Sequence, residues 1–436
     1  MNGWKIRGLQ HLYTFAMYLL TPFILNRLLW RSIRAPGYRL RWKERFGYIT
    51  EPSSYGGIWI HAVSLGEVNA AVPLIRALIE KYPNRQFIVT TVTPTGSDRV
   101  KQVFGSTVFH VYLPYDLPSA VNRFLDRVQP SMAVVMETEI WPNLYYACGE
   151  RDLPLFLANA RLSRQSEAAY KPIRYLVSMA LQCVWGVAAQ ADADAIRLMN
   201  LGAFHERVRM VNSLKFDIDI EQETIELGNK FRTEVFGTRP VWLAASTHEG
   251  DEEPVLEAHK KLLDLFPDLL LVLVPRHPER FDRAHDLCHK VGVSTVLRSQ
   301  NVEVCQATQC YLGDTLGELL MLYQAADIAF VGGSLSDVGG HNVLEPAALA
   351  KPVLFGPNIS NFDEICTSLL EGKGAMQVRD GGELYSQMVE LLNDKDLVKS
   401  TGRKAAQVVL DQRGAVGLTL ALIDEFTADG KPCIKY

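Results

Sequence analysis

The chain lacks several features that mark specialised classes of protein. Its seven cysteines are scattered, and no two of them stand in a Cys-x-x-Cys pair. This odd, dispersed set argues against a disulfide framework and a structural zinc site, and it suits a reducing compartment. The formal net charge of −4 provides no global attraction to nucleic acid. The Gly-x-x-x-x-Gly-Lys-Ser/Thr signature is absent as well, which excludes a P-loop enzyme.

Charged side chains are also missing from residues 8 to 26, which form one long, largely apolar stretch. A bilayer-spanning helix needs roughly 20 apolar residues, and Pro22 and several hydroxyls make this stretch a marginal one. Residues 1–50 contain nine Lys and Arg residues against one acid, Glu44. By the positive-inside rule, this excess predicts that the rest of the chain is cytoplasmic. No small-residue cleavage site follows the apolar stretch, which disfavours a cleaved signal peptide.

The sequence leaves three alternatives open for this N-terminal segment. The first is a single-pass membrane anchor. The second is a helix that lies on the membrane, with Trp30, Tyr38 and Trp42 among the headgroups and arginines on the lipid phosphates. The third is a helix buried against the protein itself. In the first two alternatives, membrane lipid is a partner of the chain.

The size and pattern of the remaining chain predict two α/β domains. A length of 436 residues is too great for one ordinary core, and 48% hydrophobic with 22% charged residues is typical of a globular chain. Apolar stretches such as 87–92 and 269–274 alternate with helical stretches over residues 56–220 and again over 238–412. This alternation is typical of parallel sheets with helices on both faces. A last apolar segment, 416–426, is expected to be a helix that crosses back onto the first domain.

Polar residues follow the predicted strands of the first domain, and ligands of such sheets bind at the carboxyl ends of the strands. Glu67 and Glu137 come from separate strand ends and are candidates for a catalytic base and a charge stabiliser. Each is equally typical of a helix cap or of an ion pair with a nearby arginine. Lys215 is a candidate to bind a phosphate or carboxylate, although lysines in such positions are also common on solvated surfaces. The polar residues at these strand ends are Ser64, Gly66, Glu67, Thr93, Thr95, Glu137, Glu139, Asn159, Arg161 and Lys215.

Two local expectations follow in the same half. Residues 64–67 are expected to form a turn before a helix that begins at Val68. Two Asp-x-Asp pairs, 192/194 and 217/219, are expected to be structural, because a metal ion requires more oxygen ligands than one pair supplies. No metal site is therefore expected in the chain.

The most distinctive stretch of the second half is the glycine-rich segment 336–346, between a predicted strand at 327–334 and helix-forming residues at 347–350. Glycines let the backbone approach a ligand closely, and a helix start attracts anions such as phosphate. Asn342 is expected to cap the helix or to bond the ligand, and Glu345 to accept from ribose hydroxyls. A tight turn followed by a capped helix fits the same pattern.

A second strand end of this half carries a guanidinium. Arg276 follows the predicted central strand at 269–274 and is well placed to bind a phosphate through two N–H groups. Together with the glycine-rich segment, it makes the second half the candidate nucleotide-binding domain.

Seven segments, taken in order along the chain, resemble motifs of the Kdo transferases of Gram-negative bacteria, which add 3-deoxy-D-manno-octulosonic acid (Kdo) to the lipid A precursor. The resemblance runs from the N-terminal segment to about residue 412 and includes the basic stretch 41–47. Seven motifs in order are far more specific than any one of them. The segments are 61–67, 93–96, 136–143, 158–163, 213–217, 275–280 and 340–346.

The resemblance implies a GT-B glycosyltransferase, with two Rossmann-like, doubly wound domains that face each other across a cleft and an N-terminal membrane-anchor helix. It implies inverting transfer of Kdo from CMP-Kdo to a lipid A precursor of the lipid IVA type, in the inner-core lipopolysaccharide pathway, at the cytoplasmic side of the inner membrane. No cofactor, protein-bound metal or nucleic acid is implied. We expect a membrane anchor with a basic membrane-facing segment at 1–50, an acceptor-binding domain at 51–225, a nucleotide-sugar-binding domain at 226–412, and a returning helix with a tail at 413–436.

The resemblance also implies roles for single residues. Glu67 matches the general base of the family, and Glu137 and Lys215 match residues assigned to transition-state stabilisation. The anomeric carbon of Kdo is tertiary and bears a carboxylate, so we expect an oxocarbenium-like transition state, with Glu67 taking the proton of the attacking hydroxyl. The departing phosphate needs hydrogen-bond donors, such as Arg276 and the helix start at Asn342. The segments that match the CMP-binding motifs contain Pro275, Arg276, Leu316, Gly317, Glu318, Asn342, Val343, Leu344 and Glu345.

Three other functions fit parts of the sequence. A sugar-nucleotide epimerase shares the two-domain plan but needs no lipid acceptor, so residues 1–50 argue against it. A membrane-tethered sugar-nucleotide binder without turnover has no use for a base such as Glu67. A transferase that uses another donor is the third, because the preference for cytidine rests on the resemblance alone.

Overall fold

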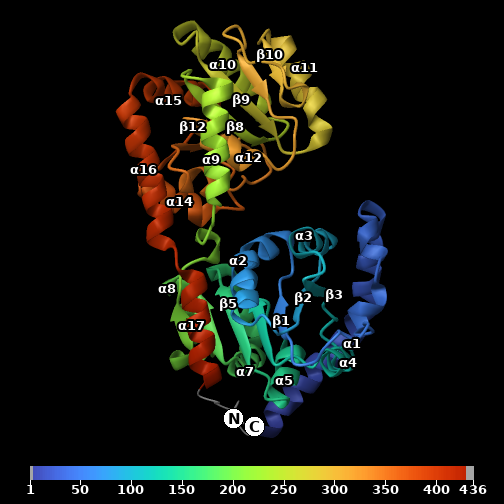
Figure 1. Cartoon of the computed structure of the whole chain (residues 1–436). Coiled ribbons are helices and arrows are strands. Elements are labelled where there is room, and N and C mark those ends of the chain that lie inside the picture. The colour runs from blue at the N-terminus through green and yellow to red at the C-terminus, as the bar shows by residue number, and fades with distance from the viewer. Residues whose placement is uncertain (1–2, 429–436) are drawn as a thin grey trace. The chain divides into compact units, whose positions relative to one another are not determined.

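The strands of the chain form two separate parallel sheets. In the computed structural model, which describes residues 3–428, each sheet has seven strands, and the two sheets lie in different units. The first unit contains the chain up to Asp217 and again from Arg413, and the second is Ile218–Gln412 (Figure 1). All the strand pairings are parallel. The predicted fold class, α/β with two doubly wound sheets, is therefore confirmed.

The first sheet consists of β1 (Ile58–His61), β2 (Phe87–Thr91), β3 (Val108–Tyr112), β4 (Met132–Met136), β5 (Leu155–Ala160), β6 (Gly186–Ala189) and β7 (Val208–Met210). Its strand order is β3-β2-β1-β4-β5-β6-β7. Within β1, Trp59 belongs to the core on one face of the sheet, and Ile58 and Ile60 belong to the core on the other. Because both faces are covered, most strands read as continuous apolar runs.

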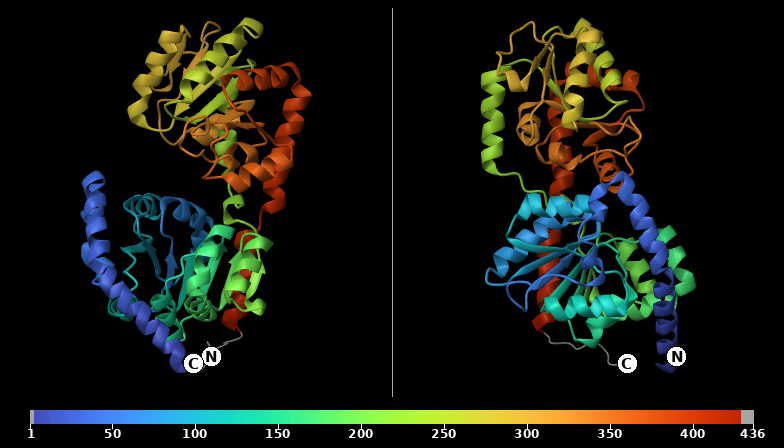
Figure 2. Two further views of the ribbon diagram at one scale, coloured as in Figure 1. Left: turned by 180° about the vertical axis from the view of Figure 1, so that it is seen from behind. Right: turned by 90° about the vertical axis from the view of Figure 1, so that its right-hand side faces the viewer.

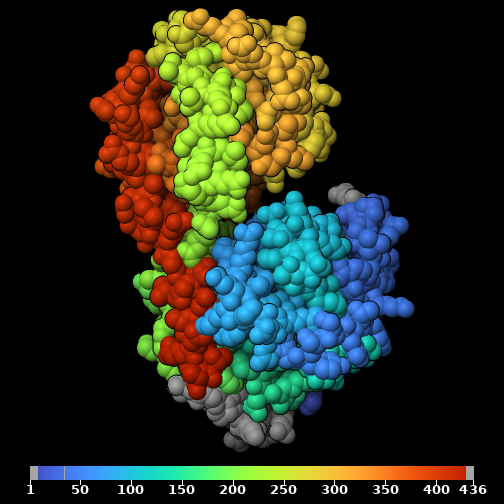
Figure 3. All heavy atoms as spheres, in the orientation of Figure 1, coloured from blue at the N-terminus to red at the C-terminus, as the bar shows by residue number. Residues whose placement is uncertain are grey.

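Helices cover both faces of the first sheet. They are α1 (Gly3–Arg34), α2 (Leu65–Lys81), α3 (Pro94–Phe104), α4 (Pro118–Val128), α5 (Pro142–Glu150), α6 (Arg164–Tyr170), α7 (Arg174–Gln182), α8 (Asp192–Leu201) and α17 (Ala415–Ala428). The face with Trp59 packs against α4, α5, α7 and α8, and the opposite face against α2, α3 and α17. Near the C-terminal end of the chain, α17 lies beside α2 (Figure 3). Asp217 accepts the backbone N–H groups of Gly414 (2.6 Å) and Val416 (2.5 Å), which fixes the start of this returning helix.

The second sheet repeats the plan. Its strands are β8 (Val241–Thr247), β9 (Leu270–Pro275), β10 (Thr295–Leu297), β11 (Cys310–Leu312), β12 (Ile328–Val331), β13 (Val353–Phe355) and β14 (Ala375–Gln377), in the order β10-β11-β9-β8-β12-β13-β14. Its helices are α9 (Gln222–Phe231), α10 (Glu252–Leu265), α11 (Phe281–Val291), α12 (Leu319–Ala325), α13 (Leu344–Ala348), α14 (Asp363–Glu371), α15 (Gly381–Asn393) and α16 (Lys395–Gln412). One core packs against α10, α11 and α15, and the other against α9 and α12.

The structure differs from the sequence-based expectation in two places. The edge strands β10 and β14 were not predicted, because each has only three residues and no fully buried stretch to mark it. The expected turn at 64–67 is wrong. Ser64 is the N-cap of α2, which begins at Leu65, because the Ser64 hydroxyl accepts the backbone N–H of Glu67 (3.4 Å).

The long helix α1 runs along the first unit with one face against it (Figure 2). The Tyr13 hydroxyl donates to the Asp116 carboxylate (2.8 Å), and the Tyr18 hydroxyl donates to Ser119 (2.9 Å). The stretch Gly8–Ile33 is long and apolar enough to cross a membrane, and only 6% of its most apolar window is buried. The buried-helix alternative is therefore wrong. The large apolar side chains exposed along α1 are Leu12, Phe15, Tyr18, Leu19, Leu20, Phe23, Leu29, Trp30 and Ile33.

Candidate active site

Each sheet has one point at which the strand order reverses. In the first sheet β1 pairs with both β2 and β4, and in the second β8 pairs with both β9 and β12. Open parallel sheets bind ligands outside the carboxyl ends of the strands at this switch point. In the first sheet, the segments that follow β1 and β4 carry Glu67 and Glu137. In the second, the segments that follow β8 and β12 carry His248 and the glycine-rich loop 332–343.

Glu67 closes the N-terminal cap of α2. Its carboxylate accepts the backbone N–H of Val63 (2.9 Å) and the hydroxyl of Ser64 (3.1 Å), while Ser64 in turn accepts the N–H of Glu67. This reciprocal arrangement resembles a capping box, so the predicted alternative of a cap residue is confirmed. The cap leaves acceptor capacity on the carboxylate, because two oxygens offer about four lone-pair sites. The same bonds hold the side chain in one position at the switch point.

The carboxyl of Glu67 is unusually basic. The residue is only 7% exposed, and its carboxyl has a pKa raised to about 7, mainly by burial. The negative charges of Glu137 and Glu139 also raise the pKa, while the hydrogen bonds from Val63 and Ser64 lower it. A carboxylate with a pKa near the working pH is suited to accept a proton during a reaction.

Glu137 and Glu139 bring two more carboxylates to this edge. Glu137 follows β4 with a φ of 55°, in the left-handed region that is costly for a residue with a side chain. Its backbone N–H donates to Ala158 (2.9 Å), which holds this conformation. Glu139 accepts the indole N–H of Trp141 (3.1 Å), and burial raises the pKa of its carboxyl. Strained residues of this kind concentrate at functional sites.

Asn159 connects the end of β5 to the short turn that carries Lys215. It is fully buried, with a φ of 55°, and lies where the β5–β6 register shifts by one residue. Its side-chain oxygen accepts the backbone N–H of Leu214 (2.9 Å) and the hydroxyl of Ser213 (3.3 Å). The turn Leu214–Phe216, with Lys215 at its centre, also packs on α2. The three predicted catalytic residues thus come from α2, the β4 end and this turn, all at one edge of the first sheet.

A buried carboxylate, Asp251, holds the corresponding edge of the second sheet together. It is fully buried and accepts four backbone N–H groups, those of His248 (2.9 Å), Gly333 (2.7 Å), Leu335 (3.0 Å) and Ser336 (3.1 Å). These bonds tie the loop after β8 to the glycine-rich loop after β12. Sequence reasoning missed this role, because an acid beside a loop glycine gives no sign of its distant partners.

Three imidazoles gather beside this loop. The Nε2 atoms of His248 and His341 are 2.8 Å apart, and the two rings are nearly parallel, at 11°. His277 presents an edge contact to His248, with ring centroids 5.2 Å apart. Burial lowers the pKa of His248, and it lowers that of His341 to about 4. No role was predicted for these histidines from the sequence.

The predicted donor-binding segments follow neighbouring strands of the second sheet. Pro275 ends β9, and the backbone N–H of Arg276 donates to Thr247 (3.0 Å) while its side chain is exposed. Gly317, after β11, has a φ of 85°, and the preceding Leu316 is 72% exposed. Both segments therefore offer exposed groups at the carboxyl edge of the sheet.

Two predicted donor-binding acids already have partners. The Glu318 carboxylate accepts two N–H groups of Arg298 (3.1 and 2.9 Å), which lowers its pKa against the opposing effect of burial. Glu345 accepts an amide N–H of Asn342 (3.0 Å).

The expectation that Asn342 caps the following helix needs correction. The N-cap of α13 is Val343 and the helix has only five residues. Asn342 instead accepts the N–H of Leu344 (3.1 Å) in a local turn, because its side chain lies two residues earlier than the first helical N–H. Together, Asn342, Val343, Leu344 and Glu345 form a compact turn at the end of the glycine-rich loop.

The Asp-x-Asp pairs have structural partners. Asp194 accepts the N–H of Leu162 (2.9 Å), and Asp217 holds the start of α17 as described above. Among residues 3–428, no group of three or more His, Cys, Asp or Glu side chains is arranged to hold a metal ion.

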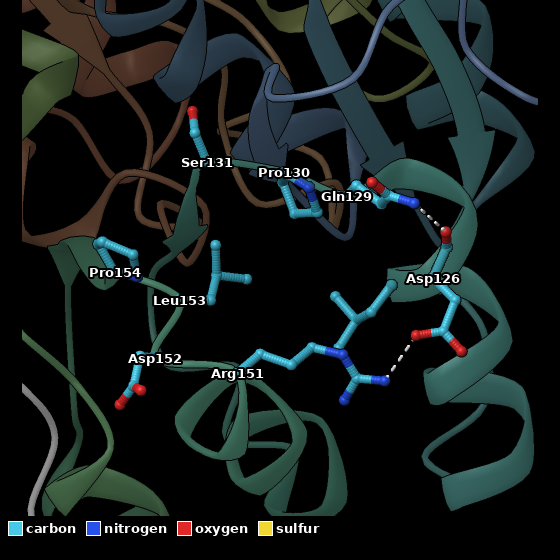
Figure 4. A pocket seen from close by; sticks show the side chains of 9 residues that line it. Asp126, Gln129, Pro130, Ser131, Arg151, Asp152, Leu153 and Pro154 are labelled. Carbon is cyan, nitrogen blue, oxygen red and sulfur yellow. Dashed lines mark hydrogen bonds and ion pairs between the residues drawn. The ribbon is translucent and has the colours of Figure 1, made fainter.

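One surface cavity of the first unit lies away from this chemistry. This cavity of ≈ 600 Å³ is lined by Ser131 and Pro154, which precede β4 and β5 (Figure 4). Its wall includes an ion pair between Arg151 and Asp126 (2.8 Å). The cavity is therefore at the amino ends of these strands, opposite to the edge with Glu67 and Glu137.

Comparisons with known proteins give a consistent result. Residues 40–218 match the family model described as 3-deoxy-D-manno-octulosonic-acid transferase (kdotransferase). The 3-deoxy-D-manno-octulosonic acid transferase of Haemophilus influenzae is 42% identical over 421 residues, which cover 95% of this chain and 98% of that protein. The corresponding protein of Bordetella pertussis is 33% identical over 427 residues, with coverages of 95% and 98%.

Solved structures share the fold at lower identity. The UDP-GlcNAc 2-epimerase of Neisseria meningitidis, bound to UDP-GlcNAc, aligns with a TM-score of 0.57 and 12% identity, over 85% of this chain and all of that chain. At this identity the likeness concerns the fold alone.

Proposed function

The chain belongs to the Kdo transferase family of glycosyltransferases, and from this premise we propose that it moves Kdo from CMP-Kdo to a lipid A precursor of the lipid IVA type, with inversion and with Glu67 as the general base. This places the reaction in inner-core lipopolysaccharide synthesis. The observation that carries the assignment of the base is the buried carboxyl of Glu67 at the switch point, with a pKa of about 7. Family membership, rather than fold, decides against a sugar-nucleotide epimerase, since the epimerase neighbour is only 12% identical.

The proposed step is a single displacement at the anomeric carbon of Kdo. The acceptor hydroxyl oxygen forms a bond to this carbon while the bond from the carbon to the CMP phosphate oxygen breaks with its electron pair. Glu67 takes the hydroxyl proton and later releases it to water. An oxocarbenium-like transition state carries positive charge, which the carboxylate of Glu137 stabilises. Lys215 counters negative charge on the sugar carboxylate or the phosphate.

The second unit is proposed to hold the nucleotide. The exposed guanidinium of Arg276 is suited to bind the phosphate through two N–H groups. The turn formed by Asn342, Val343, Leu344 and Glu345 is proposed to contact the sugar nucleotide, with Pro275 and the segment Leu316–Glu318 along the same edge. In this assignment Glu318 acts through Arg298, which it orients, and the preference for cytidine rests on the family resemblance.

We assign α1 to the cytoplasmic surface of the inner membrane, lying in the interface rather than crossing the bilayer. A crossing helix has lipid on all sides, whereas Tyr13 and Tyr18 donate hydrogen bonds to Asp116 and Ser119 of the first unit. The exposed apolar side chains along α1 give lipid a surface to bind, and the basic residues that follow suit anionic headgroups.

The proposed function is tested by supplying the full-length, membrane-bound protein with CMP-Kdo generated in situ and a lipid A precursor, and by reading the product mass. We expect mass gains of one or more Kdo units, and none with Glu67→Gln, which still binds CMP. Loss of CMP binding together with activity in this variant would instead favour a structural role for Glu67. No product from the unaltered protein would overturn the substrate assignment.

The membrane orientation has its own test. A cysteine at Gln10, in a background carrying Cys305→Ser and Cys433→Ser, reports which side of the membrane the helix start occupies. In right-side-out membrane vesicles we expect a membrane-impermeant maleimide to leave this cysteine unlabelled, and in inverted vesicles we expect labelling. The reverse pattern would show that α1 crosses the bilayer.

A further inference from the structure

Two imidazoles share a single proton beside the glycine-rich loop of the second unit. The Nε2 atoms of His248 and His341 are 2.8 Å apart, so one of them donates an N–H and the other accepts it. Two protonated rings cannot form this bond, because both Nε2 atoms would then be donors. The pair therefore exists either neutral or with one added proton.

The surroundings keep the pair neutral until a negative charge arrives. His277, Arg276 and Arg280 face it and disfavour a further positive charge, as does burial. Among residues 3–428, Asp251 is the carboxylate that faces both rings. Its oxygens accept the four backbone N–H groups described above and the hydroxyl of Ser336 (3.2 Å).

The remaining acids close to the loop after β8 are already paired with cations. Arg280 donates to Glu252 (3.1 Å from Nε) and to Glu249 (3.4 Å). Glu249 also accepts from Arg283 (3.0 Å). The exposed guanidinium of Arg276 therefore remains beside the imidazole pair as a positive charge that can attract an anion.

The imidazole pair is also in direct contact with the loop that is proposed to bind the donor. A Cβ atom at Gly333, whose φ is 69°, would come within 2.8 Å of the Cδ2 atom of His341. The ring thus packs on the backbone of the glycine-rich loop. Among residues 3–428, the Nδ1 atoms of His248 and His341 have no hydrogen-bond partner, which leaves them available to a ligand.

We propose that the His248–His341 pair takes up one proton when the anionic part of the sugar nucleotide binds to the second unit. The proton enters at the Nδ1 lone pair of one ring and comes from solvent, while the Nε2–H···Nε2 bond is retained. Both Nδ1 atoms are then N–H donors, and the pair carries one positive charge. This inference rests on the proposed nucleotide-sugar function and adds to it the uptake of one proton from solvent when the donor binds.

The expected size of the effect follows from the pKa of His341, which is about 4 in the free protein. An opposite charge within about 4–6 Å raises such a pKa by roughly 1–3 units. The raised pKa then lies at about 5–7, so uptake is expected to be about 0.4–0.9 proton per ligand at pH 5 and at most about 0.2 at pH 7.5. The anion is either the nucleotide phosphate or the sugar carboxylate, and both carry the charge that the pair requires.

The test is calorimetric titration of the full-length protein in detergent with CMP, at pH 5 and 7.5, in buffers of small and large ionisation enthalpy. The number of protons taken up is the difference between the unaltered protein and His341→Asn, because the titration of CMP itself cancels in that comparison. We expect a difference of about 0.4–0.9 proton at pH 5, and a similar difference for His248→Asn. His289→Asn is the matched control and is expected to match the unaltered protein, because His289 is exposed on α11 and is not among the groups that face the pair.

Titrations with different ligands identify which anionic group causes the proton uptake. Uptake with CMP, but not with cytidine, assigns the phosphate. Uptake that appears only when free Kdo is added with CMP assigns the sugar carboxylate. CMP binding with the same proton count in the unaltered protein and His341→Asn in every arm would overturn the proposal and leave the proposed function intact. No binding of CMP at all would overturn both.

A measurement on the unaltered protein guards against variants that fold poorly. The Kd for CMP is expected to weaken at least about twofold, and by up to about tenfold per pH unit, as pH rises from 5 to 7, after correction for the titration of CMP. A corrected Kd that does not change over this range would also overturn the proposal. The thermal unfolding midpoint of each variant checks that the fold is kept.

Discussion

The switch points of the two sheets have the same architecture and opposite chemistry. In the first unit the loops after β1 and β4 carry Glu67, Glu137 and Glu139, and mutual repulsion and burial raise the pKa of Glu67 to about 7. In the second unit the loops after β8 and β12 carry His248 and His341, whose pKa values are lowered by burial and by neighbouring cations. One edge is poised to accept a proton from a ligand, and the other is poised to receive an anion.

The buried residues that hold the loops of the two edges together also differ in charge. Each edge has a register shift of one residue, at Asn159 in β5 and at Ser246 in β8, where φ is 55° and 54°. The buried holder of the acidic edge is the amide of Asn159, and the buried holder of the cationic edge is the carboxylate of Asp251. A carboxylate at the first position would add to the repulsion around Glu67, whereas at the second it offsets the surrounding cations. The two units share one fold, and a few buried groups therefore determine how the chemistry of their edges differs.

The largest expected effect comes from removing Glu67, the proposed base, from the acidic edge. Glu67→Gln is nearly isosteric and keeps an oxygen for the α2 cap, but it cannot accept a proton at neutral pH. We expect kcat to fall by about 10²–10⁴-fold, the usual contribution of general base catalysis. The measurement is transfer to the lipid A precursor at saturating donor. Glu80→Gln, an exposed residue on the same helix, is the matched control and should retain activity.

The second largest effect is expected from removing the charge of Asp251, the buried carboxylate that holds the loops of the cationic edge together. Asp251→Asn replaces one acceptor oxygen by an NH₂ group that faces backbone donors, so that buried N–H groups lose their partner. Each buried unsatisfied group costs about 1–3 kcal/mol, and we expect the free energy of unfolding of the second unit to fall by about 3 kcal/mol. Chemical denaturation measures this change. An unfolding transition equal to that of the unaltered protein would show that the loop does not depend on this carboxylate.

The two edges also differ in how much of their structure could be predicted from the sequence. Most of the strands were predictable because buried parallel strands are continuous apolar runs, and the places of Glu67, Glu137 and Arg276 beyond strand ends were predictable because these residues follow such runs. The roles of Asp251 and of the His248–His341 pair were not, because their partners lie 82 to 93 residues away in the sequence. No local pattern specifies which loops meet at a switch point. The turn expected at 64–67 was wrong because Ser64 and Glu67 form a capping pattern at the start of α2, whereas Ser64 was assigned to the turn.

The third prediction concerns pH and distinguishes the two edges directly. Glu67 must be ionised to act as a base, so kcat/KM is expected to rise with pH up to about 7, by about tenfold per unit on the acid limb. The pKa of Glu67 is higher in the folded than in the unfolded protein, so its contribution to stability is fully present below the unfolded value and is lost as pH rises through about 7. Activity therefore increases over the range in which this contribution declines. In Glu67→Gln both the acid limb and this part of the pH dependence of unfolding should disappear.

The smallest effect is expected from replacing the amide of Asn159, at the acidic edge, by a carboxylate. Asn159→Asp keeps the oxygen that accepts from Leu214 and Ser213, and among residues 3–428 the Asn159 NH₂ group has no partner to lose. The added charge should raise the pKa of Glu67 and move the acid limb of kcat/KM upward by less than about one unit, because the new carboxyl is itself buried and is protonated over part of this range. Asn159→Leu is the control, since it disrupts the turn that carries Lys215 without adding charge, and it should lower kcat without moving the limb. A limb that moves equally in both variants would show that the position of Glu67, rather than the charge around it, sets its pKa, and the electrostatic contrast between the two edges would then be a consequence of packing alone.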